Sequence, residues 1–313
     1  MTGSPPRPQR APAVLGIGEV LWDLLPSGRR LGGAPFNVTA QLARMGFTAG
    51  YLTAVGDDEP GLAACERMRE LGVGTALVRT VALPTGRAEV TLDAAGEPRF
   101  DVLSPAAHDR LAAGDVAAAV LAAGAADVLV YGTLASQEPA TCELVGRLAA
   151  AAPQHALRVY DVNLREGRWA PGLVHRLAAH ANVLKLSESE LIALLGLPDG
   201  RERPLDDAAV ESGLRTLADR YGLRAAACSM GGRGGALLLD GAFARAASAP
   251  VAVADTVGAG DAFTAALAEG LHRTLPAARA LRRANALGGL TASRTGALPD
   301  WTRAEWEALT DST

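Results

Sequence analysis

The chain has 313 residues, of which 49% are hydrophobic and 4% aromatic, and its formal net charge is −4. A chain of this length buries enough apolar surface to fold without a disulfide or a metal, and its apolar content excludes an intrinsically disordered protein. The mildly acidic charge argues against a protein that binds nucleic acid or a membrane surface, since such proteins need a dense basic patch. We therefore expect a soluble globular protein whose partners are small molecules.

Three features of the sequence predict a cytoplasmic location. The cysteines Cys65, Cys142 and Cys228 stand far apart and have no metal-ligand or CxxC spacing, which favours reduced thiols over a disulfide. No apolar run reaches the roughly 18 residues that a membrane span needs. Residues 1–12 are rich in Pro and Arg and lack the apolar core of a signal peptide. We expect these residues to form a flexible tail and residues 13–313 to form a single domain.

Strand and helix patterns alternate along the chain. Such alternation implies right-handed crossovers and a mainly parallel sheet covered on both faces, which is an α/β fold. In chain order, we expect strands at 13–17, 50–55, 127–131, 158–162, 183–186 and 225–229, an extended segment at 19–25, and helices after the Gly32-Gly33 pair and at 60–71, 139–152 and 264–272.

One region departs from this alternation. Residues 78–103 alternate between polar and apolar side chains around a turn at 94–97, which is the pattern of a β-hairpin. Companion strands are available in residues 19–31. We therefore predict a small β lid, built from about 19–33 and 78–105, rather than an ordinary edge hairpin. The exposed lid strands also favour a homodimer formed through the lid.

The segment DTVGAGDAF (255–263) is the strongest candidate for chemistry. Small residues before a helix let a ligand approach the backbone, and the free N–H groups and the helix dipole attract an anion. A carboxylate at Asp261 would repel a phosphate unless it were accepting a proton, which suits phosphoryl transfer. Spacing alone leaves open a helix-capping Asp after a glycine-rich turn, which is the commoner feature.

A second glycine-rich turn, Gly32-Gly33, precedes the first helix. Asn37 in that helix offers both a donor and an acceptor to a hydroxylated substrate. Asp23 lies upstream on an extended segment that reaches the same end of the sheet, and carboxylates accept hydrogen bonds from paired sugar hydroxyls. Each of these residues, taken alone, is also explained as a cap or a turn former.

In combination, these segments resemble a known family. GGAPFNV (32–38), LARMG (42–46), VGDDEPG (55–61) and DTVGAGDAF (255–263) are similar to the ordered landmarks of the ribokinase-like (PfkB) sugar kinases, and GEVLWD (18–23) and DVNLR (161–165) resemble bacterial fructokinases. The resemblance spans about residues 14–299. It implies a three-layer ribokinase-like α/β fold with a mainly parallel sheet flanked by helices and a small β-sheet lid. The implied activity is ATP-dependent transfer of the γ-phosphoryl group to a sugar primary hydroxyl, with fructose favoured as the acceptor.

The resemblance also implies roles for single residues. Asp261 matches the catalytic base, and the anion hole corresponds to Gly258, Ala259 and Gly260. Sugar-contacting positions correspond to Asp23, Gly33, Asn37, Asn163 and Arg165. The segment SMGGRG (229–234) resembles the nucleotide loop Thr-Leu-Gly-x-x-Gly, and the nucleotide positions correspond to Ser229, Gly231, Gly234 and Asn285.

Members of this family use ATP with Mg²⁺, and many are activated by a monovalent cation such as K⁺. The resemblance places Glu190 as a water-mediated Mg²⁺ residue, although Ser187 stands where the family often has Asn in Asn-x-x-Glu. Asp255, near the loop at 292–296, corresponds to the monovalent-cation site.

Lys185 is the only lysine among 30 basic side chains. It precedes the segment that contains Ser187 and Glu190, on the side where nucleotide phosphates would lie, so we predict that it binds the nucleotide. A compact ammonium acts there as a point charge that a planar guanidinium does not reproduce. Chance survival of one lysine in an arginine-rich sequence explains it equally well.

Several alternatives are open at this stage. The same scaffold suits 2-keto-3-deoxygluconate, ribose or a nucleoside as the acceptor. An NAD(P)-dependent oxidoreductase is suggested by Gly16 and Gly18 after a strand, but Leu21 stands where the third glycine of that fingerprint is needed. A non-catalytic regulator that binds sugar or nucleotide is disfavoured because Asp261 is present.

Overall fold

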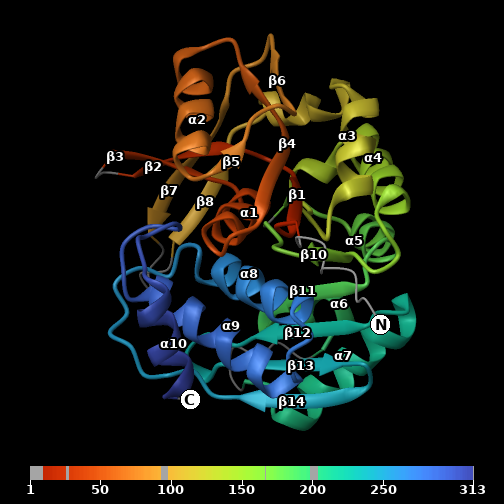
Figure 1. The fold of residues 1–313 in the computed structure, drawn as a ribbon, viewed down its shortest axis with the longest axis vertical. Coiled ribbons are helices and arrows are strands. Elements are labelled where there is room, and N and C mark those ends of the chain that lie inside the picture. Colours follow the sequence, from red (N-terminus) through yellow and green to blue (C-terminus); the bar gives the residue numbers. More distant parts are fainter. Residues whose placement is uncertain (1–9, 26–27, 93–97, 166, 198–203, 313) are drawn as a thin grey trace, which may run out of the picture.

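The computed structural model describes residues 10–25, 28–92, 98–165, 167–197 and 204–312. In these residues the large sheet comprises β1 (Ala13–Ile17), β4 (Thr48–Gly56), β5 (Val73–Gly74), β6 (Val78–Val81), β9 (Val128–Gly132), β10 (Leu157–Asp161), β11 (Val183–Ser187), β12 (Ala225–Ser229), β13 (Gly235–Leu239) and β14 (Ala242–Ala246). Their order is β14-β13-β12-β11-β10-β9-β1-β4-β5, and β6 pairs with β4 outside this path (Figure 1). The six predicted strands are confirmed, with ends that differ by at most two residues.

The pairing within the large sheet is parallel except at one end. β1 lies between β4 and β9, with Gly16 opposite Tyr51 on one side and Val130 on the other. β13 and β14 are antiparallel to their neighbours. The mainly parallel α/β sheet predicted from the alternation of elements is therefore confirmed.

Helices cover both faces of this sheet (Figure 1). Successive strand residues point to opposite faces, so Val128 and Val130 join one core while Leu129 and Tyr131 join the other. On the first face lie α1 (Ala34–Arg44), α2 (Glu59–Glu70), α8 (Ala259–His272), α9 (Ala277–Ala292) and α10 (Arg303–Asp311); on the second lie α3 (Val116–Ala125), α4 (Pro139–Ala151), α5 (Pro171–Ala178), α6 (Glu188–Leu195) and α7 (Asp207–Tyr221).

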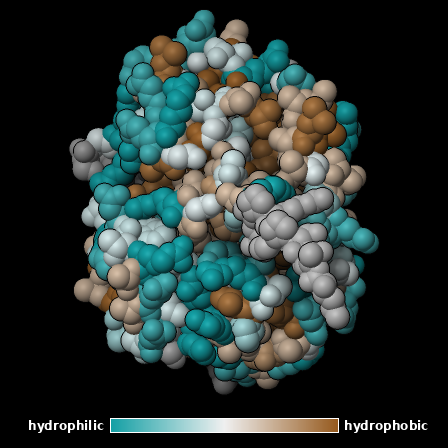
Figure 2. Space-filling model, viewed as in Figure 1, coloured by the Kyte–Doolittle hydropathy of each residue, from teal (hydrophilic) through white to brown (hydrophobic). Residues whose placement is uncertain are grey.

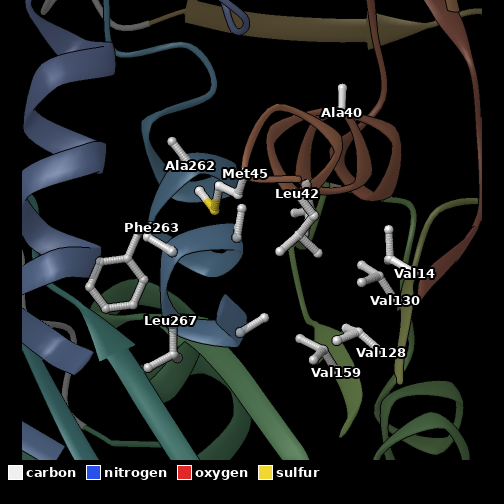
Figure 3. Packing of buried hydrophobic residues seen from close by; sticks show 14 of the residues in the cluster. Val14, Ala40, Leu42, Met45, Val128, Val130, Val159, Ala262, Phe263 and Leu267 are labelled. Carbon is white, nitrogen blue, oxygen red and sulfur yellow. The ribbon is translucent and has the colours of Figure 1, made fainter. Parts of the chain in front are cut away.

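Two helices on the first face bring the glycine-rich segments together. Figure 3 shows Leu42 and Met45 of α1 beside Ala262 and Phe263 of α8, above valines that project from the sheet. Phe36, Leu42 and Met45 are buried on this side. A hydrogen bond from Asn37 to Asp261 brings the N-terminal turns of α1 and α8 close together.

The start of α8 differs from the prediction. We expected the helix to begin near residue 264, whereas it begins at Ala259 with Gly258 as its N-cap. Gly258 has φ +77, and a Cβ there would lie 2.4 Å from Cα of Ala297. Only glycine fits this left-handed, crowded position without strain. Asp261 therefore lies in the first turn of α8 rather than before it.

A small four-stranded sheet lies beside the large one. Its order is β3 (Gly28–Gly32), β2 (Leu21–Leu25), β7 (Gly86–Leu92) and β8 (Pro98–Val102). Residues 78–81, expected in this lid, form β6 and pair in parallel with β4 instead. Alternation of side chains does not specify which sheet a strand joins. The turn predicted at 94–97 lies outside the described residues, and the roles of the small sheet as a lid and a dimer interface stay predictions.

The surface has no extended apolar band on the face shown in Figure 2, where hydrophobic residues form separate small groups among hydrophilic ones. Among the described residues, no helix has the length and apolar character needed to cross a membrane.

Candidate active site

A cavity of about 210 Å³ opens where β1, β9, β10 and β11 end, and residues of the small sheet line its other side. Ligands of α/β proteins bind at the carboxyl ends of parallel strands. The structure brings nine of the predicted site residues together in this cavity, which we call the acceptor cavity: Asp23, Gly33, Asn37, Asn163, Arg165, Lys185, Gly258, Gly260 and Asp261.

Asp261 lies in the acceptor cavity at the N-terminus of α8. Nδ2 of Asn37 donates a hydrogen bond of 2.7 Å to Oδ2 of Asp261. The first N–H groups of a helix have no partner within the helix. The Ala259 N–H is bonded to the Thr256 carbonyl at 3.2 Å, whereas those of Gly260 and Asp261 have no backbone acceptor among the described residues. The Ala259 N–H, a predicted donor to an anion, is therefore already bonded within the protein, and the anion hole stays a prediction.

The electrostatics of Asp261 suit a general base. Burial raises the pKa of its carboxyl group to about 7, and the nearby Asp161 carboxylate acts in the same direction. The hydrogen bond from Asn37 and the charges of Lys185 and Arg165 lower this pKa, but by less. A carboxylate with a pKa near neutrality accepts a proton well at physiological pH.

Lys185 holds a buried charge pair beside this base. Its Nζ lies 3.2 Å from Oδ1 of Asp161, and a Cβ on Gly260 would lie 3.1 Å from the same Nζ. Burial by itself lowers the pKa of the Lys185 ammonium, but the Asp161, Glu190 and Asp261 carboxylates outweigh it, so that the pKa is raised. Lys185 was predicted among the nucleotide residues, yet it lines the acceptor cavity next to the start of α8.

Asp23 supplies a second carboxyl group to the acceptor cavity. Burial raises its pKa to about 7, helped by the Asp255 carboxylate and opposed by Arg165. Leu21, Ala88 and Val102 add an apolar wall from the small sheet. This combination of paired polar groups and a short apolar wall fits a small polyhydroxylated ligand.

Glu19 is a cavity residue that the sequence analysis did not single out. It is 3% exposed, its Oε1 accepts the Ala34 N–H at 3.2 Å, and its Oε2 is buried without a hydrogen-bond partner among the described residues. Burial raises its pKa. The sequence offered one indication that Glu19 lines a ligand cavity. Glu19 comes directly after Gly18 at the end of β1, and ligands of parallel sheets bind at the ends of the strands.

A second cavity of about 480 Å³ adjoins the first, with Thr256 and Gly260 lining both. We call it the nucleotide cavity. Small and apolar residues form most of its wall, including Ala249, Val251 and Phe263. The predicted nucleotide residues that line it are Ser229, Gly231, Gly234 and Asn285, and Ala259 also lies here.

The Arg245 side chain joins the loop that precedes β13 to the end of β14. Its guanidinium donates hydrogen bonds to the carbonyls of Arg233, Gly235 and Ala246 at 2.7, 3.0 and 2.6 Å, and its Nε pairs with Asp207. Arg245 was not predicted, because nothing in its position along the chain showed that it reaches this loop.

Asn285 acts from α9 on the same region. Its Nδ2 donates to the carbonyls of Ala246 and Ala247 at 2.9 and 3.1 Å. The amide N–H groups of Asn285, a predicted nucleotide residue, are therefore bonded within the protein. Asn285 lines the nucleotide cavity, and its role toward a nucleotide stays a prediction.

Glu190 lines neither cavity. Its Oε1 accepts the Leu164 N–H at 2.6 Å and its Oε2 accepts the Ser187 N–H at 2.7 Å, while Oγ of Ser187 accepts the Glu190 N–H. This is a capping box at the start of α6. The described residues include no group of three or more His, Cys, Asp or Glu side chains that could hold a metal ion. A role of Glu190 toward Mg²⁺ stays a prediction.

Asp255 also has its oxygens occupied. They accept the Val257 and Gly296 N–H groups at 3.0 and 2.8 Å, and Nη1 of Arg30 lies 3.9 Å from Oδ2. A cation bound to this carboxylate would meet the Arg30 guanidinium. The monovalent-cation role of Asp255 stays a prediction.

Comparison with known proteins places the chain among carbohydrate kinases. The model of the pfkB family carbohydrate kinases matches residues 28–303. A fructokinase from Klebsiella pneumoniae is 31% identical over 267 residues, which cover 82% of this chain and 83% of that protein.

Solved structures share the fold. A 2-dehydro-3-deoxygluconokinase from Thermotoga maritima has a TM-score of 0.83 at 19% identity, covering 96% of this chain and 99% of the other. A fructokinase from Xylella fastidiosa with bound ATP has a TM-score of 0.78 at 23% identity, covering 96% and 98%. The ribokinase-like fold expected from the sequence is confirmed, and the chain belongs to the PfkB family of carbohydrate kinases.

Proposed function

We propose that this protein is an ATP-dependent kinase that phosphorylates a primary hydroxyl of a sugar, with fructose as the favoured acceptor. The observation that supports it most directly is the Asn37–Asp261 hydrogen bond at the N-terminus of α8. It holds a carboxylate of raised pKa in the acceptor cavity, and the adjoining nucleotide cavity shares Gly260 with it.

In this proposal Asp23 and Asn37 orient the sugar through its hydroxyl groups. Asp261 takes the proton of the attacking hydroxyl, whose oxygen forms a bond to the γ-phosphorus while the bond to the β-phosphate oxygen breaks. The free N–H groups at the start of α8 and the Lys185 ammonium face the negative charge that the transferred group carries. Closure of the small sheet would exclude water as a competing acceptor.

Mg²⁺ would reach this site bound to the nucleotide phosphates, whose charge it would partly neutralise. The chain offers no cluster of carboxylates for it among the described residues, and Mg²⁺ in kinases is held largely by phosphates and water. ATP as the donor agrees with the ATP bound by the fructokinase from Xylella fastidiosa.

A second acceptor, 2-keto-3-deoxygluconate, is favoured by one feature of the cavity. Arg165 lines the acceptor cavity, and a guanidinium is well suited to a carboxylate. The structural similarity to a 2-dehydro-3-deoxygluconokinase agrees with this alternative. Fructose carries no carboxylate, so the two acceptors make different use of Arg165.

A coupled assay of ADP release tests the acceptor. Fructose, 2-keto-3-deoxygluconate, ribose and a nucleoside are compared by kcat/KM with wild type and with Arg165→Gln. We expect the highest kcat/KM for fructose and a modest loss in the variant. A higher value for 2-keto-3-deoxygluconate that collapses in Arg165→Gln would identify the acid as the substrate. Turnover of no acceptor would contradict the kinase proposal.

A further inference from the structure

A third cavity, of about 360 Å³, lies between the small sheet, α2 and the loop after α9. Figure 1 shows this loop rising from the C-terminal helices toward the small sheet. The cavity shares no lining residue with the acceptor or nucleotide cavity. Its charged and aromatic lining residues are Trp22, Arg29, Arg30 and Arg67. We call it the arginine cavity.

The arginine cavity is lined by three guanidinium groups and by no carboxylate. Two of them have acidic partners on α2: Arg29 pairs with Glu59 and Arg67 with Glu70. The Glu59 and Glu70 side chains are 70% and 63% exposed, so they lie toward the solvent. The single contact of Arg67 with Glu70 contributes little free energy, so an anion in the cavity competes for Arg67 at low cost. Arg29 donates two hydrogen bonds to Glu59, and an anion must compete with both of them.

Arg30 is the third guanidinium, and one of its nitrogens lacks a partner. Nη1 of Arg30 is buried without a hydrogen-bond acceptor among the described residues. Its nearest carboxylate oxygen, Oδ2 of Asp255, lies 3.9 Å away and already accepts the Gly296 N–H. A buried guanidinium N–H without a hydrogen-bond acceptor carries a desolvation cost, which an anionic ligand that accepts from it would remove.

Trp22 gives the cavity a fixed aromatic wall. Its indole is 8% exposed, its Nε1 donates to the Pro60 carbonyl at 2.9 Å, and the Arg29 guanidinium lies 4.7 Å from its ring centroid. Leu31 and Leu71 extend this wall. A ligand that fits this lining has a compact, multiply charged anionic group for the arginines and a short carbon skeleton for the apolar wall. A phosphate monoester has both, and arginine binds phosphate oxygens through paired N–H donors.

We propose that the arginine cavity is an effector site for a small phosphorylated metabolite. It connects to the acceptor cavity through β2, where Trp22 lines one cavity and its neighbour Asp23 lines the other. It also connects through Arg30 to Asp255, which bonds the Val257 N–H in the acceptor cavity.

The two cavities meet at β2, where Trp22 lines the arginine cavity and its neighbour Asp23 lines the acceptor cavity. An anion bound beside Trp22 therefore lies next to the strand that carries Asp23, and we expect effector binding to change the KM for the sugar. The expected effect on the KM depends on the proposed kinase function, whereas binding of the anion to the arginine cavity does not.

Isothermal titration with glycerol 3-phosphate tests the site, with glycerol and inorganic phosphate titrated at the same ionic strength. We expect Arg67→Ala and Arg30→Ala each to weaken glycerol 3-phosphate binding about tenfold, the value of one charged hydrogen bond. Glu59→Gln frees Arg29 and should tighten binding. The control Arg215→Ala, an exposed arginine of α7 paired with Glu211, should bind as wild type does.

Three results would overturn the proposal: equal binding of glycerol, inorganic phosphate binding as tight as glycerol 3-phosphate, or unchanged affinity in both arginine variants. Arg67 lines neither the acceptor cavity nor the nucleotide cavity, so loss of binding in Arg67→Ala would not come from a change in the lining of either. Because titration needs no turnover, failure of the kinase proposal leaves this test intact. Addition of glycerol 3-phosphate should change the sugar KM in wild type and not in Arg67→Ala.

Discussion

The side-chain amide of Asn37 donates a hydrogen bond of 2.7 Å to the Asp261 carboxylate across 224 positions of the chain. This bond joins the first turn of α1 to the first turn of α8, so both glycine-rich segments meet at one carboxylate. Oδ1 of Asn37 is buried without a hydrogen-bond partner among the described residues. The amide therefore presents a free acceptor in the cavity where a substrate hydroxyl would bind.

Asp261→Asn tests the base, because it keeps the shape of the side chain and removes its capacity to accept a proton. We expect kcat to fall by about 10²–10⁴-fold, the usual contribution of general base catalysis, with the KM for ATP changed by a few-fold at most. Steady-state kinetics of ADP release measure both. Asp219→Asn, on the exposed side of α7, is the matched control and should behave as wild type. Undiminished kcat in Asp261→Asn would remove the base from the mechanism.

The pH dependence of kcat/KM for the sugar should report the raised pKa of Asp261. The carboxylate must be ionised to accept a proton, so kcat/KM rises with pH through about 7. Asn37→Ala removes a hydrogen bond that lowers this pKa, and the midpoint of the rise should therefore move to higher pH. An unmoved midpoint would show that another group controls the rise.

Asp23→Asn tests sugar recognition. Loss of a charged acceptor costs roughly 1.5–3 kcal/mol, which corresponds to a sugar KM raised by about 10–100-fold. The KM for ATP should not change, because Asp23 does not line the nucleotide cavity. Asp101 is an exposed residue on β8 of the same small sheet, so Asp101→Asn is the control for any effect of a lost carboxylate on that sheet. Equal sugar KM values in the two variants would exclude Asp23 from the site.

Lys185→Met should destabilise the fold by roughly 3–5 kcal/mol, because it leaves the buried Asp161 carboxylate without its charged partner and with only the hydrogen bond from the Thr264 hydroxyl among the described residues. Urea unfolding measures this loss, and Asp161→Asn added to Lys185→Met should restore part of it. Lys185→Arg separates charge from shape, since it retains the charge but not the compact ammonium. We expect a lower kcat in Lys185→Arg. Unchanged kcat and ATP KM in that variant would mean that any cation suffices.

Arg245→Met should raise the KM for ATP about tenfold, because three carbonyls near the nucleotide cavity lose their charged donor. The sugar KM should stay unchanged, which distinguishes this effect from general destabilisation. Arg224→Met is the control, since the Arg224 side chain pairs with exposed Asp240. Equal ATP KM values in the two variants would show that Arg245 does not position the loop for the nucleotide.

Much of this site was predictable because its residues follow local rules. Glycine-rich turns before helices, a carboxylate inside one of them and polar residues at strand ends are all properties of short segments. Glu19 and Arg245 were missed for different reasons. Glu19 is distinguished from other acidic residues by its burial, which the sequence does not show. Arg245 is distinguished from other arginines by its hydrogen bonds to backbone carbonyls at the ends of β13 and β14, which depend on how these strands pair.

The sequence by itself determined the alternation of strands and helices, the mainly parallel sheet and the two glycine-rich segments of the site. These depend on apolar periodicity and backbone freedom, which are local. Tertiary structure decided that β6 pairs with β4, that α8 begins at Ala259, and that Lys185 pairs with Asp161 beside the base. It also shifted the pKa values of Asp23 and Asp261 to about 7, because burial and charge at a residue depend on segments far away in the chain.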